Sequence, residues 1–411
     1  MIETGKEFTE FVEKNKEKET DKLLLSYSGK CTFDLRLAVN TIEGRRKMVK
    51  KVPEWGSNRD LVYPWIISTE QCSSWHTAMF KQQFFRGYPL AIDLTGGLGV
   101  DSYYISKVCA RVLMFEKNEA LYSAAIHNFR ALGASNVLFY NMEVSSITIE
   151  DVFKGKVSSD VAKKDICTYI DPSRRAKSGK RIYSVKDYEP DIFSFKDVIL
   201  KYSDRLVVKI SPMEDITQIL KLFNNCRELH IISVYNECKE ILLIIDSNQN
   251  SGNWNRTPII AWNLNRKGEW ESTSWTIGEE TESNVEYTEP VEGMYLYEPN
   301  SSLIKGGAFR IICKRFSLRK ADKSSHLYFS NLQNSEFQGK IFSIERVYDF
   351  DKRSLSDIRK HYQRSTVSVR NFPLSADELK NKLKIEEGEE FHIFGTTLPL
   401  NKKKLIVCKK I

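Results

Sequence analysis

The sequence predicts an α/β protein with a mostly parallel sheet that ends in an antiparallel hairpin, preceded by a helical segment and followed by an α+β module. Short apolar runs begin at residue 90 and are mostly separated by helical patterns, which is typical of a parallel sheet covered on both faces. The last two runs are joined by Tyr235–Glu240, which is too short for a crossover helix, so these strands are predicted to form a hairpin. The length of 411 residues predicts roughly two to four domains.

The composition excludes several classes of protein. Hydrophobic residues make up 41% of the chain and charged residues 28%, which excludes a mainly disordered chain. No apolar run is long enough to span a bilayer, and the N-terminus has no signal-peptide pattern, so we expect a cytoplasmic protein without a membrane partner. The eight cysteines form no C-x-x-C pair and have no His at ligand spacing, so we expect neither a structural metal nor disulfides.

Residues 1–86 are predicted to be mostly helical, and the clearest helix spans Ser68–Phe85. Trp75, Ala78, Met79 and Phe85 mark an apolar face of this helix. Its polar face carries Ser73, Thr77 and Lys81. Because the helix comes just before the first strand, its polar face can cross the mouth of a ligand site. The alternative is that the helix only packs against the sheet through its apolar face.

Seven apolar runs are predicted to be the strands of a central domain, residues 87–250. They are Leu90–Leu94, Val112–Phe115, Val137–Tyr140, Ile166–Ile170, Leu206–Ile210, Leu229–Val234 and Ile241–Ile245. Residues 251–319 are predicted to form a β-rich connector, and residues 320–411 a basic α+β module. The strands predicted in the C-terminal part are Phe309–Cys313, Leu327–Phe329, Ile341–Val347, Val367–Val369, Glu390–Phe394 and Leu405–Cys408, and the helices are Ser354–Gln363 and Ser375–Leu383.

The most informative segment is Ala91-Ile-Asp-Leu-Thr-Gly-Gly-Leu-Gly-Val-Asp101, a strand that ends in a glycine-rich turn before a helix. The glycines permit tight backbone geometry and close approach of a ligand, and the helix N-terminus offers unpaired N–H groups. The G-x-G-x-x-G spacing of a dinucleotide site is absent, and Asp93 would repel a phosphate. The turn is therefore either purely structural or suited to a cationic or amino-acid-like ligand.

Polar residues also follow the second and third strands. Glu116 ends the second strand about twenty residues beyond the turn, where an acid can accept both ribose hydroxyls of NAD or S-adenosylmethionine. Asn141 and Glu143 follow the third strand. Because ligands of open α/β sheets bind at the carboxyl edge, these residues are predicted to lie together there.

The segment D-L-T-G-G-L-G, followed by Glu116, resembles motifs I and II of class I S-adenosylmethionine-dependent methyltransferases. The form D-L-T-x-G-L-G-x-D is similar to that of some ribosomal RNA guanine-N2 methyltransferases, with Thr95 in place of the first glycine of the commoner turn. The predicted hairpin matches the terminal antiparallel pair of this family, so the resemblance implies a Rossmann-like methyltransferase sheet. It also implies S-adenosylmethionine as the cofactor, with its methionine end at Gly97 and Gly99, its ribose at Glu116 and its adenine near Asn141 or Glu143. The candidate cofactor-binding residues are Asp93, Thr95, Gly96, Gly97, Gly99, Asp101, Glu116, Lys117, Asn141 and Glu143.

The fourth strand continues into Asp171-Pro172-Ser173-Arg174, which resembles the D-P-P-Y or N-P-P-Y of amino-methyltransferases and the D-P-P-R of RNA methyltransferases. The resemblance implies that Asp171, Pro172 and Ser173 are catalytic. A carboxylate here can accept hydrogen bonds from an amino group, which aims the nitrogen lone pair at the methyl carbon, and it can take the proton that leaves. Ser173 replaces the second proline, and no aromatic follows directly. Tyr183 or Tyr188 is therefore the candidate to stack on a flipped base.

Further basic and polar residues are candidates for substrate binding. Arg174 and Arg175 either hold an RNA phosphate or form a surface pair. Lys209, Ser211 and Pro212 follow the fifth strand and are predicted to line the substrate pocket, although Lys209 can equally be a buried partner for Asp171.

The cysteines favour nitrogen as the methylated atom. Methylation of pyrimidine carbon 5 needs a cysteine nucleophile. Cys167 lies within the fourth strand and is expected in the core, and Cys238 lies in the hairpin turn, away from the expected position.

The whole layout resembles a group of bacterial methyltransferases with a C-terminal THUMP-like domain. The shared features are D-L-T-G-G-L-G, D-P-S-R-R, V-K-I-S-P-M, N-E-C-K-E and Arg370-Asn-Phe-Pro-Leu374. This resemblance implies a ferredoxin-like character for the connector and a THUMP-like domain in residues 320–411. Residues 301–411 hold 23 basic and 12 acidic residues and so carry a net charge of +11, whereas the first 300 residues carry −3. The basic part either grips RNA or is a solvated lysine-rich surface.

The leading interpretation is an S-adenosylmethionine-dependent methyltransferase acting on a base nitrogen of tRNA or rRNA, with guanine favoured. A second interpretation keeps the cofactor and places the methyl group on a protein or small molecule. A third is a non-catalytic RNA-binding protein with a relic cofactor fold.

Overall fold

The computed structural model describes residues 2, 4–145, 148–157, 160–174, 188–249 and 252–411. For Ser173, Arg174, Tyr188, Glu189 and Ser194 it describes the backbone alone. The chain divides into two compact units, of which the first comprises Met1–Glu214, Asn225–Arg227 and Ile241–Ser251. The second comprises Asp215–Asn224, Glu228–Glu240 and Gly252–Ile411.

The first unit begins with helices, as the sequence predicts. They are α1 (Lys6–Asn15), α2 (Thr20–Tyr27), α3 (Leu35–Lys51), α4 (Pro53–Ser57) and α5 (Ile66–Gln71). Asp34 caps α3 by accepting a hydrogen bond from the backbone N–H of Leu37 at 3.0 Å. Apolar residues of α1, α2 and α3 bury one another in a small core that includes Phe8, Val12, Leu23 and Ile42. None of the described helices is long and apolar enough to cross a membrane.

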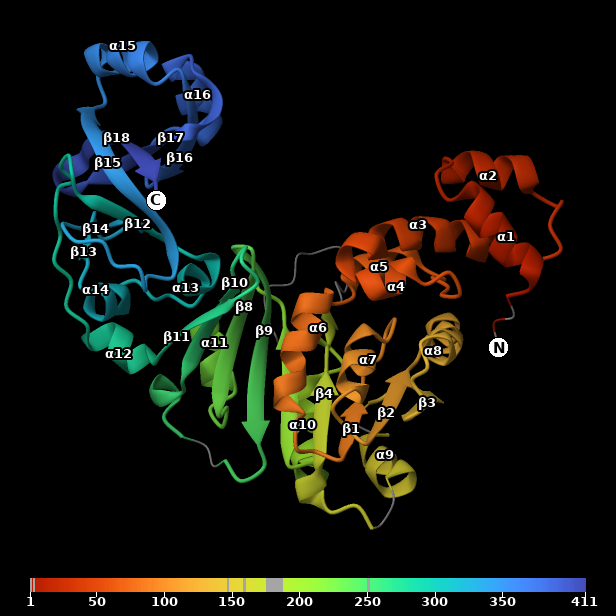
Figure 1. The fold of residues 1–411 in the computed structure, drawn as a ribbon. Coiled ribbons are helices and arrows are strands. Elements are labelled where there is room, and N and C mark those ends of the chain that lie inside the picture. The colour runs from red at the N-terminus through yellow and green to blue at the C-terminus, as the bar shows by residue number, and fades with distance from the viewer. Residues whose placement is uncertain (1, 3, 146–147, 158–159, 175–187, 250–251) are drawn as a thin grey trace. The chain divides into compact units, whose positions relative to one another are not determined.

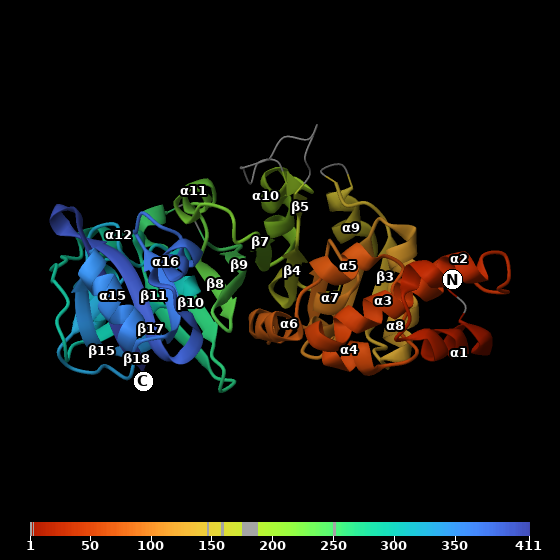
Figure 2. The ribbon, with the colours of Figure 1, turned by 90° about the horizontal axis from the view of Figure 1, so that it is seen from above.

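The sheet of the first unit confirms the predicted α/β class. Its strands are β1 (Leu90–Asp93), β2 (Arg111–Glu116), β3 (Val137–Asn141), β4 (Ile166–Ile170), β7 (Arg205–Ile210) and residues 241–246 of β9. The strand order is β9-β7-β4-β1-β2-β3, with parallel pairing except between β7 and β9. Helices α7 (Val100–Ser106) and α8 (Glu119–Ala131) lie on one side of these strands, and α9 (Ile149–Lys156) and α10 (Ile192–Tyr202) lie on the other (Figures 1 and 2). The sheet therefore has both faces covered, which explains the apolar runs.

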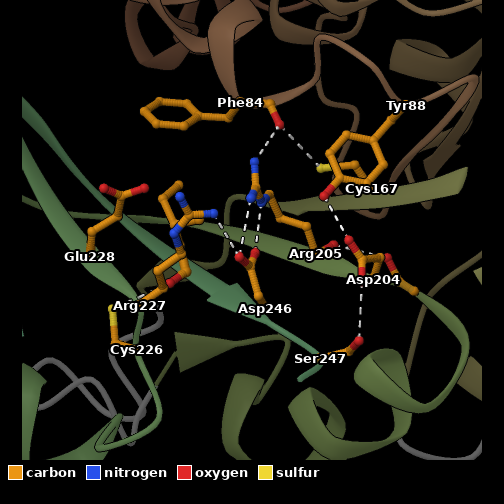
Figure 3. Close-up of polar contacts among 12 residues, drawn as sticks. Phe84, Tyr88, Cys167, Asp204, Arg205, Cys226, Arg227, Glu228, Asp246 and Ser247 are labelled. Atoms are coloured by element: carbon orange, nitrogen blue, oxygen red, sulfur yellow. Dashed lines mark hydrogen bonds and ion pairs between the residues drawn. The ribbon is translucent and has the colours of Figure 1, made fainter. Parts of the chain in front are cut away.

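An ion-pair cluster fastens the antiparallel pair of this sheet. Arg205 at the start of β7 donates two hydrogen bonds to the Asp246 carboxylate, at 2.7 and 3.1 Å, and a third to the Phe84 carbonyl (Figure 3). Arg227 donates to the same carboxylate at 2.8 Å. Burial opposes ionisation of Asp246, but the two guanidinium groups outweigh it and hold the pKa of this carboxyl below its ordinary value. The cluster thus ties the end of β9 to the start of β7.

The predicted hairpin is present, with its first strand and its turn in the second unit. β8 (Glu228–Val234) is joined to β9 (Glu237–Asp246) by Tyr235 and Asn236, whose φ angles are 53° and 67°. Two successive positive φ values are the geometry of a tight two-residue hairpin turn. β8 also pairs in parallel with β10 (Ile259–Leu264), which pairs antiparallel with β11 (Trp270–Trp275). The short helices α11 (Ile216–Leu222) and α12 (Ile277–Glu282) belong to the same unit.

A second sheet forms the C-terminal part of this unit. Its strands are β12 (Tyr295–Pro299), β13 (Arg319–Lys320), β14 (Tyr328–Ser330), β15 (Gly339–Asp349), β16 (Arg364–Arg370), β17 (Glu386–Leu398) and β18 (Lys402–Lys410), in the order β13-β14-β12-β15-β18-β17-β16. α13 (Ser301–Lys305) follows β12, and α15 (Lys352–His361) and α16 (Ala376–Leu383) follow β15 and β16. Arg370 of the R-N-F-P-L motif forms an ion pair with the buried Glu298 of β12, so this motif ties the edge strand β16 to a strand inside the sheet.

One predicted strand of this region is wrong. Phe309–Cys313 was expected to be extended, but α14 spans Ile311–Phe316. The Glu280 carboxylate of α12 accepts hydrogen bonds from the backbone N–H groups of Arg310 and Ile311, each at 2.9 Å. This contact satisfies donors that a helix start leaves unpaired. Because the partner lies thirty residues earlier, the local pattern did not reveal it.

Candidate active site

The glycine turn connects β1 to α7. Its backbone bends through Gly97 and Gly99, whose φ angles are 55° and 93°. A Cβ atom at Gly99 would lie 2.6 Å from Cε2 of the Phe129 ring, so only glycine fits there. The Gly96 N–H donates to the Phe115 carbonyl at 2.8 Å, which holds the turn against the end of β2.

Asp93 lies beneath this turn, with only 1% of its surface exposed. Its carboxylate accepts hydrogen bonds from the Ser102 hydroxyl at 2.5 Å and from the Thr95 N–H at 3.0 Å. Burial raises the pKa of Asp93 to about 7, although both hydrogen bonds oppose the shift. Among the residues that the structure describes, no cationic side chain forms an ion pair with it.

The ends of β2 and β3 bring the second group of predicted residues to the same edge. One Glu116 oxygen accepts from the Gly97 N–H at 2.7 Å, and the other accepts from the Asn118 N–H at 2.7 Å. Asn141 lies opposite Glu116 in the strand register and donates to the Glu116 carbonyl at 2.9 Å. Lys117 and Glu143, also predicted at the cofactor site, form an exposed ion pair of 2.8 Å.

The end of β4 places Asp171 beside the turn. The Asp171 N–H donates to the Thr95 hydroxyl at 2.7 Å. Lys209 of β7 reaches the Asp171 carboxylate, with its Nζ 2.6 Å from Oδ2, and its own side chain is 15% exposed. Of the two roles considered for Lys209, the structure therefore shows the ion pair with Asp171.

Other predicted residues lie after the same two strands. Pro172 is buried, and Ser211 accepts from the Met213 N–H at 3.3 Å in the turn that contains Pro212. The backbone of Ser173 and Arg174 forms β5 (Ser173–Arg174), which pairs antiparallel with β6 (Tyr188–Glu189). Arg175 and Tyr183, and the side chains of Ser173, Arg174 and Tyr188, lie outside the described residues.

The prediction of one continuous helix over Ser68–Phe85 is wrong. The structure has α5, then α6 (Trp75–Lys81) and a 3₁₀ turn, Gln82–Phe84. The break falls at Cys72–Ser74 because Ser74 caps α6 by accepting from the Thr77 N–H at 3.4 Å. Ala78 and Phe85 of the expected apolar face are buried, but Met79 is 46% exposed. The expected polar face is also buried, and Lys81 wholly so.

The buried polar side chains of this segment belong to a polar network that the sequence did not predict. Lys81 Nζ lies 3.2 Å from Oδ1 of Asp101 and 3.1 Å from the Ser73 hydroxyl. The other Asp101 oxygen accepts from Ser73 at 2.8 Å and from the Tyr169 hydroxyl at 2.9 Å. Burial opposes ionisation of Asp101, but Lys81 and then Lys209 outweigh it, so the pKa of Asp101 lies below its ordinary value. The polar face of Ser73, Thr77 and Lys81 was the one local signal for this network.

The cysteines do not provide an activated nucleophile near this edge. Cys167 is wholly buried in β4, and burial raises the pKa of its thiol well above the ordinary value. Burial also raises the pKa of Cys72 and of Cys238 to about 11. Among the described residues, no group of three or more His, Cys, Asp or Glu side chains is arranged to hold a metal ion.

Two family models match the C-terminal part of the chain, a ferredoxin-like domain at residues 295–337 and a THUMP domain-like family at residues 339–410. Over its full length the chain is similar to the crystal structure of a putative methyltransferase from Porphyromonas gingivalis W83, with a TM-score of 0.87, 29% identity and 100% of both chains covered. A putative methyltransferase from Streptococcus mutans in complex with SAH matches 42% of this chain and 95% of its own, at 16% identity and a TM-score of 0.30. An rRNA methylase from Streptococcus thermophilus matches 42% of this chain and 94% of its own, at 14% identity and a TM-score of 0.29. A comparison with curated proteins finds no match.

Proposed function

We propose that this chain, which has the fold of class I methyltransferases and a THUMP-like domain at its C-terminus, is an S-adenosylmethionine-dependent methyltransferase of tRNA or rRNA. A base nitrogen, with guanine favoured, is the proposed acceptor. The observation that supports this most is the 2.7 Å hydrogen bond from the Asp171 N–H to the Thr95 hydroxyl. Through this bond Asp171, which is predicted to orient the acceptor, lies directly against the glycine turn, which is predicted to hold the cofactor.

The residues at this edge fit the proposed cofactor. At Gly97 a Cβ would have only the Thr95 carbonyl oxygen within 4.0 Å, so the glycine leaves open space beside the turn that a ligand can approach. Glu116 uses one lone pair on each oxygen for a backbone N–H, which leaves a second on each for the two ribose hydroxyls. Asp93 is a buried acid with no cationic partner among the described residues, as expected beside a ligand that brings its own positive charge.

The proposed chemistry asks the protein mainly to position an amino group. S-adenosylmethionine supplies an activated methyl group, because its sulfonium leaves as a neutral thioether. As the nitrogen lone pair forms the new N–C bond, the nitrogen becomes cationic and must lose a proton. Lys209 occupies Oδ2 of Asp171, so Oδ1 is the atom that we assign to accept the acceptor N–H and then its proton.

The cysteines support nitrogen rather than carbon 5 as the acceptor. Carbon-5 methylation needs a thiolate that adds to the pyrimidine ring. The thiols of Cys72 and Cys167 have pKa values raised by burial, so they are protonated at neutral pH.

The C-terminal module is the proposed RNA grip. Residues 301–411 carry a net charge of +11, and the THUMP domain-like match covers residues 339–410 within them. Exposed basic residues Lys352, Arg353 and Lys360 lie on α15 of this module. Phosphate contacts from such residues would give affinity without sequence preference.

The proposal is tested by nucleoside mass spectrometry of tRNA and rRNA from cells that lack the gene, complemented with wild-type protein or with Asp171→Ala. We expect one methylated nucleoside to disappear in the deletion, to return with the wild type and to stay absent with Asp171→Ala. Calorimetry should show that Asp171→Ala still binds S-adenosylmethionine, since Asp171 is assigned to the acceptor. An unchanged nucleoside profile would instead favour a protein or small-molecule acceptor if the wild type binds the cofactor, and a non-catalytic RNA-binding protein if it does not.

A further inference from the structure

The wholly buried ammonium group of Lys81 requires a physical explanation. A lysine in a protein interior loses its hydration, and an apolar residue of similar size is often at least as stabilising in such a place. Lys81 nevertheless lies in α6 with none of its surface exposed. Its Nζ is 3.2 Å from Oδ1 of Asp101, a carboxylate that is itself only 11% exposed.

The location of Asp101 indicates what this pair does. Asp101 lies in the first turn of α7, two residues after Gly99, and its Oδ2 accepts the hydroxyl of Tyr169 at 2.9 Å. Tyr169 lies on β4, two residues before Asp171. The Asp101 carboxylate therefore joins the end of the glycine turn to the strand that presents Asp171.

This connection depends on the charge of Asp101. Ser73 and Tyr169 both donate hydroxyl hydrogens to Oδ2, and hydrogen bonds to a charged carboxylate oxygen are roughly twice as strong as those to a neutral one. Burial alone would favour the protonated form, and Lys81 is the largest influence against it. Without the ammonium group, Asp101 would gain a proton or turn towards water, and one or both hydroxyl contacts would be lost.

We propose that Lys81 is a positioning residue of the cofactor site: it holds Asp101 as a carboxylate, and Asp101 in turn fixes the glycine turn against β4. Lys81 does not touch the cofactor in this account, because it is enclosed by protein. The inference rests on the proposed function, since it assigns a role to Lys81 in binding S-adenosylmethionine.

The test measures S-adenosylmethionine affinity by calorimetry and thermal stability for the wild type, Lys81→Met and the double variant Lys81→Met/Asp101→Asn. We expect Lys81→Met to bind about tenfold more weakly, the size typical of coupling within a buried polar network. The double variant removes both charges, so its melting temperature should recover towards that of the wild type while its affinity stays low. Lys107→Met is the matched control, because Lys107 forms a more exposed pair with Glu54 and should leave the affinity unchanged.

Several results would overturn the inference. One is wild-type affinity for S-adenosylmethionine in Lys81→Met. Another is recovery of both affinity and stability in the double variant, because that result would show that the Lys81–Asp101 pair is purely structural. If Lys81→Met does not fold, Tyr169→Phe removes one hydroxyl donor to Asp101 and should weaken binding about threefold; unchanged binding would again contradict the role. Absence of binding by the wild type is a separate result that removes the proposed function and this inference with it.

Discussion

Replacing Gly99 by alanine should damage the turn in two ways that can be measured separately. The φ angle of 93° is unfavourable for any residue with a Cβ, at a cost of about 1–2 kcal/mol. The new methyl group would also lie 2.6 Å from Cε2 of Phe129, which is 1% exposed and therefore has little room to move. Overpacking of this kind costs about 1–3 kcal/mol, so the total loss should be about 2–5 kcal/mol.

Gly133 provides a matched control for the backbone effect. It has a φ of 71°, but a Cβ there would meet nothing within 4 Å. Gly133→Ala should therefore lose only the backbone part, about 1–2 kcal/mol. Urea denaturation of both variants with linear extrapolation gives the two free energies of unfolding directly, provided that the denaturant slope is unchanged.

The difference between the two variants isolates the contact with Phe129. We expect Gly99→Ala to be less stable than Gly133→Ala and to bind S-adenosylmethionine more weakly, whereas Gly133→Ala should bind as the wild type does. Phe129→Leu should also cost less in the Gly99→Ala background than alone, because it relieves the clash. Equal stability of the two glycine variants would refute the claim that the turn is closed against Phe129.

Four further predictions address charge. Because a cationic ligand favours the ionised form of Asp93, S-adenosylmethionine affinity should rise with pH up to about 7, by at most tenfold per unit, and Asp93→Asn should flatten this profile in calorimetry. Stability should move the other way, falling as pH rises from about 4 to about 7, since the folded state holds the Asp93 proton more tightly than the unfolded chain. Asp246→Ala should lower the free energy of unfolding by about 3 kcal/mol at pH 7, and an unchanged urea midpoint would contradict this. In the wild type the contribution of Asp246 should fade as pH falls below about 4, because the pKa of this carboxyl is depressed in the folded state. Replacing Lys352, Arg353 and Lys360 by alanine should weaken RNA binding and reduce the slope of log affinity against log salt by up to about three, whereas the same change at the exposed lysines 14, 16 and 18 should not.

The apolar runs located the central strands because buried parallel strands are apolar throughout. Each predicted run of the central region became a strand, and the hairpin followed from the short connection at Tyr235 and Asn236. Asp93, Thr95, Glu116 and Asp171 could be placed at one edge from the sequence, because each follows or ends a strand of one parallel sheet. In the structure, hydrogen bonds join Thr95 to Asp93 and to Asp171, and Glu116 to Gly97 of the turn.

Features that depend on distant partners were not predictable from local patterns. The start of the helix at Ile311 is capped by Glu280, 31 residues earlier in the chain. The burial of Lys81 was missed for the same reason, since a lysine on a helix is ordinarily exposed. The sequence predicts β10 and β11 only as part of a connector, because the pairing of β10 with β8 and of β11 with β10 is not visible in the composition of residues 251–300.

The proposed methyl transfer requires that the glycine turn and Glu116 bind S-adenosylmethionine. Calorimetric titration of the full-length wild type and of Glu116→Ala with S-adenosylmethionine tests it most directly. We predict binding by the wild type in the low micromolar range or tighter, and a loss of at least about tenfold in Glu116→Ala, which lacks the acceptors for both ribose hydroxyls. No binding heat with the wild type, or equal affinity of the two proteins, would contradict the account.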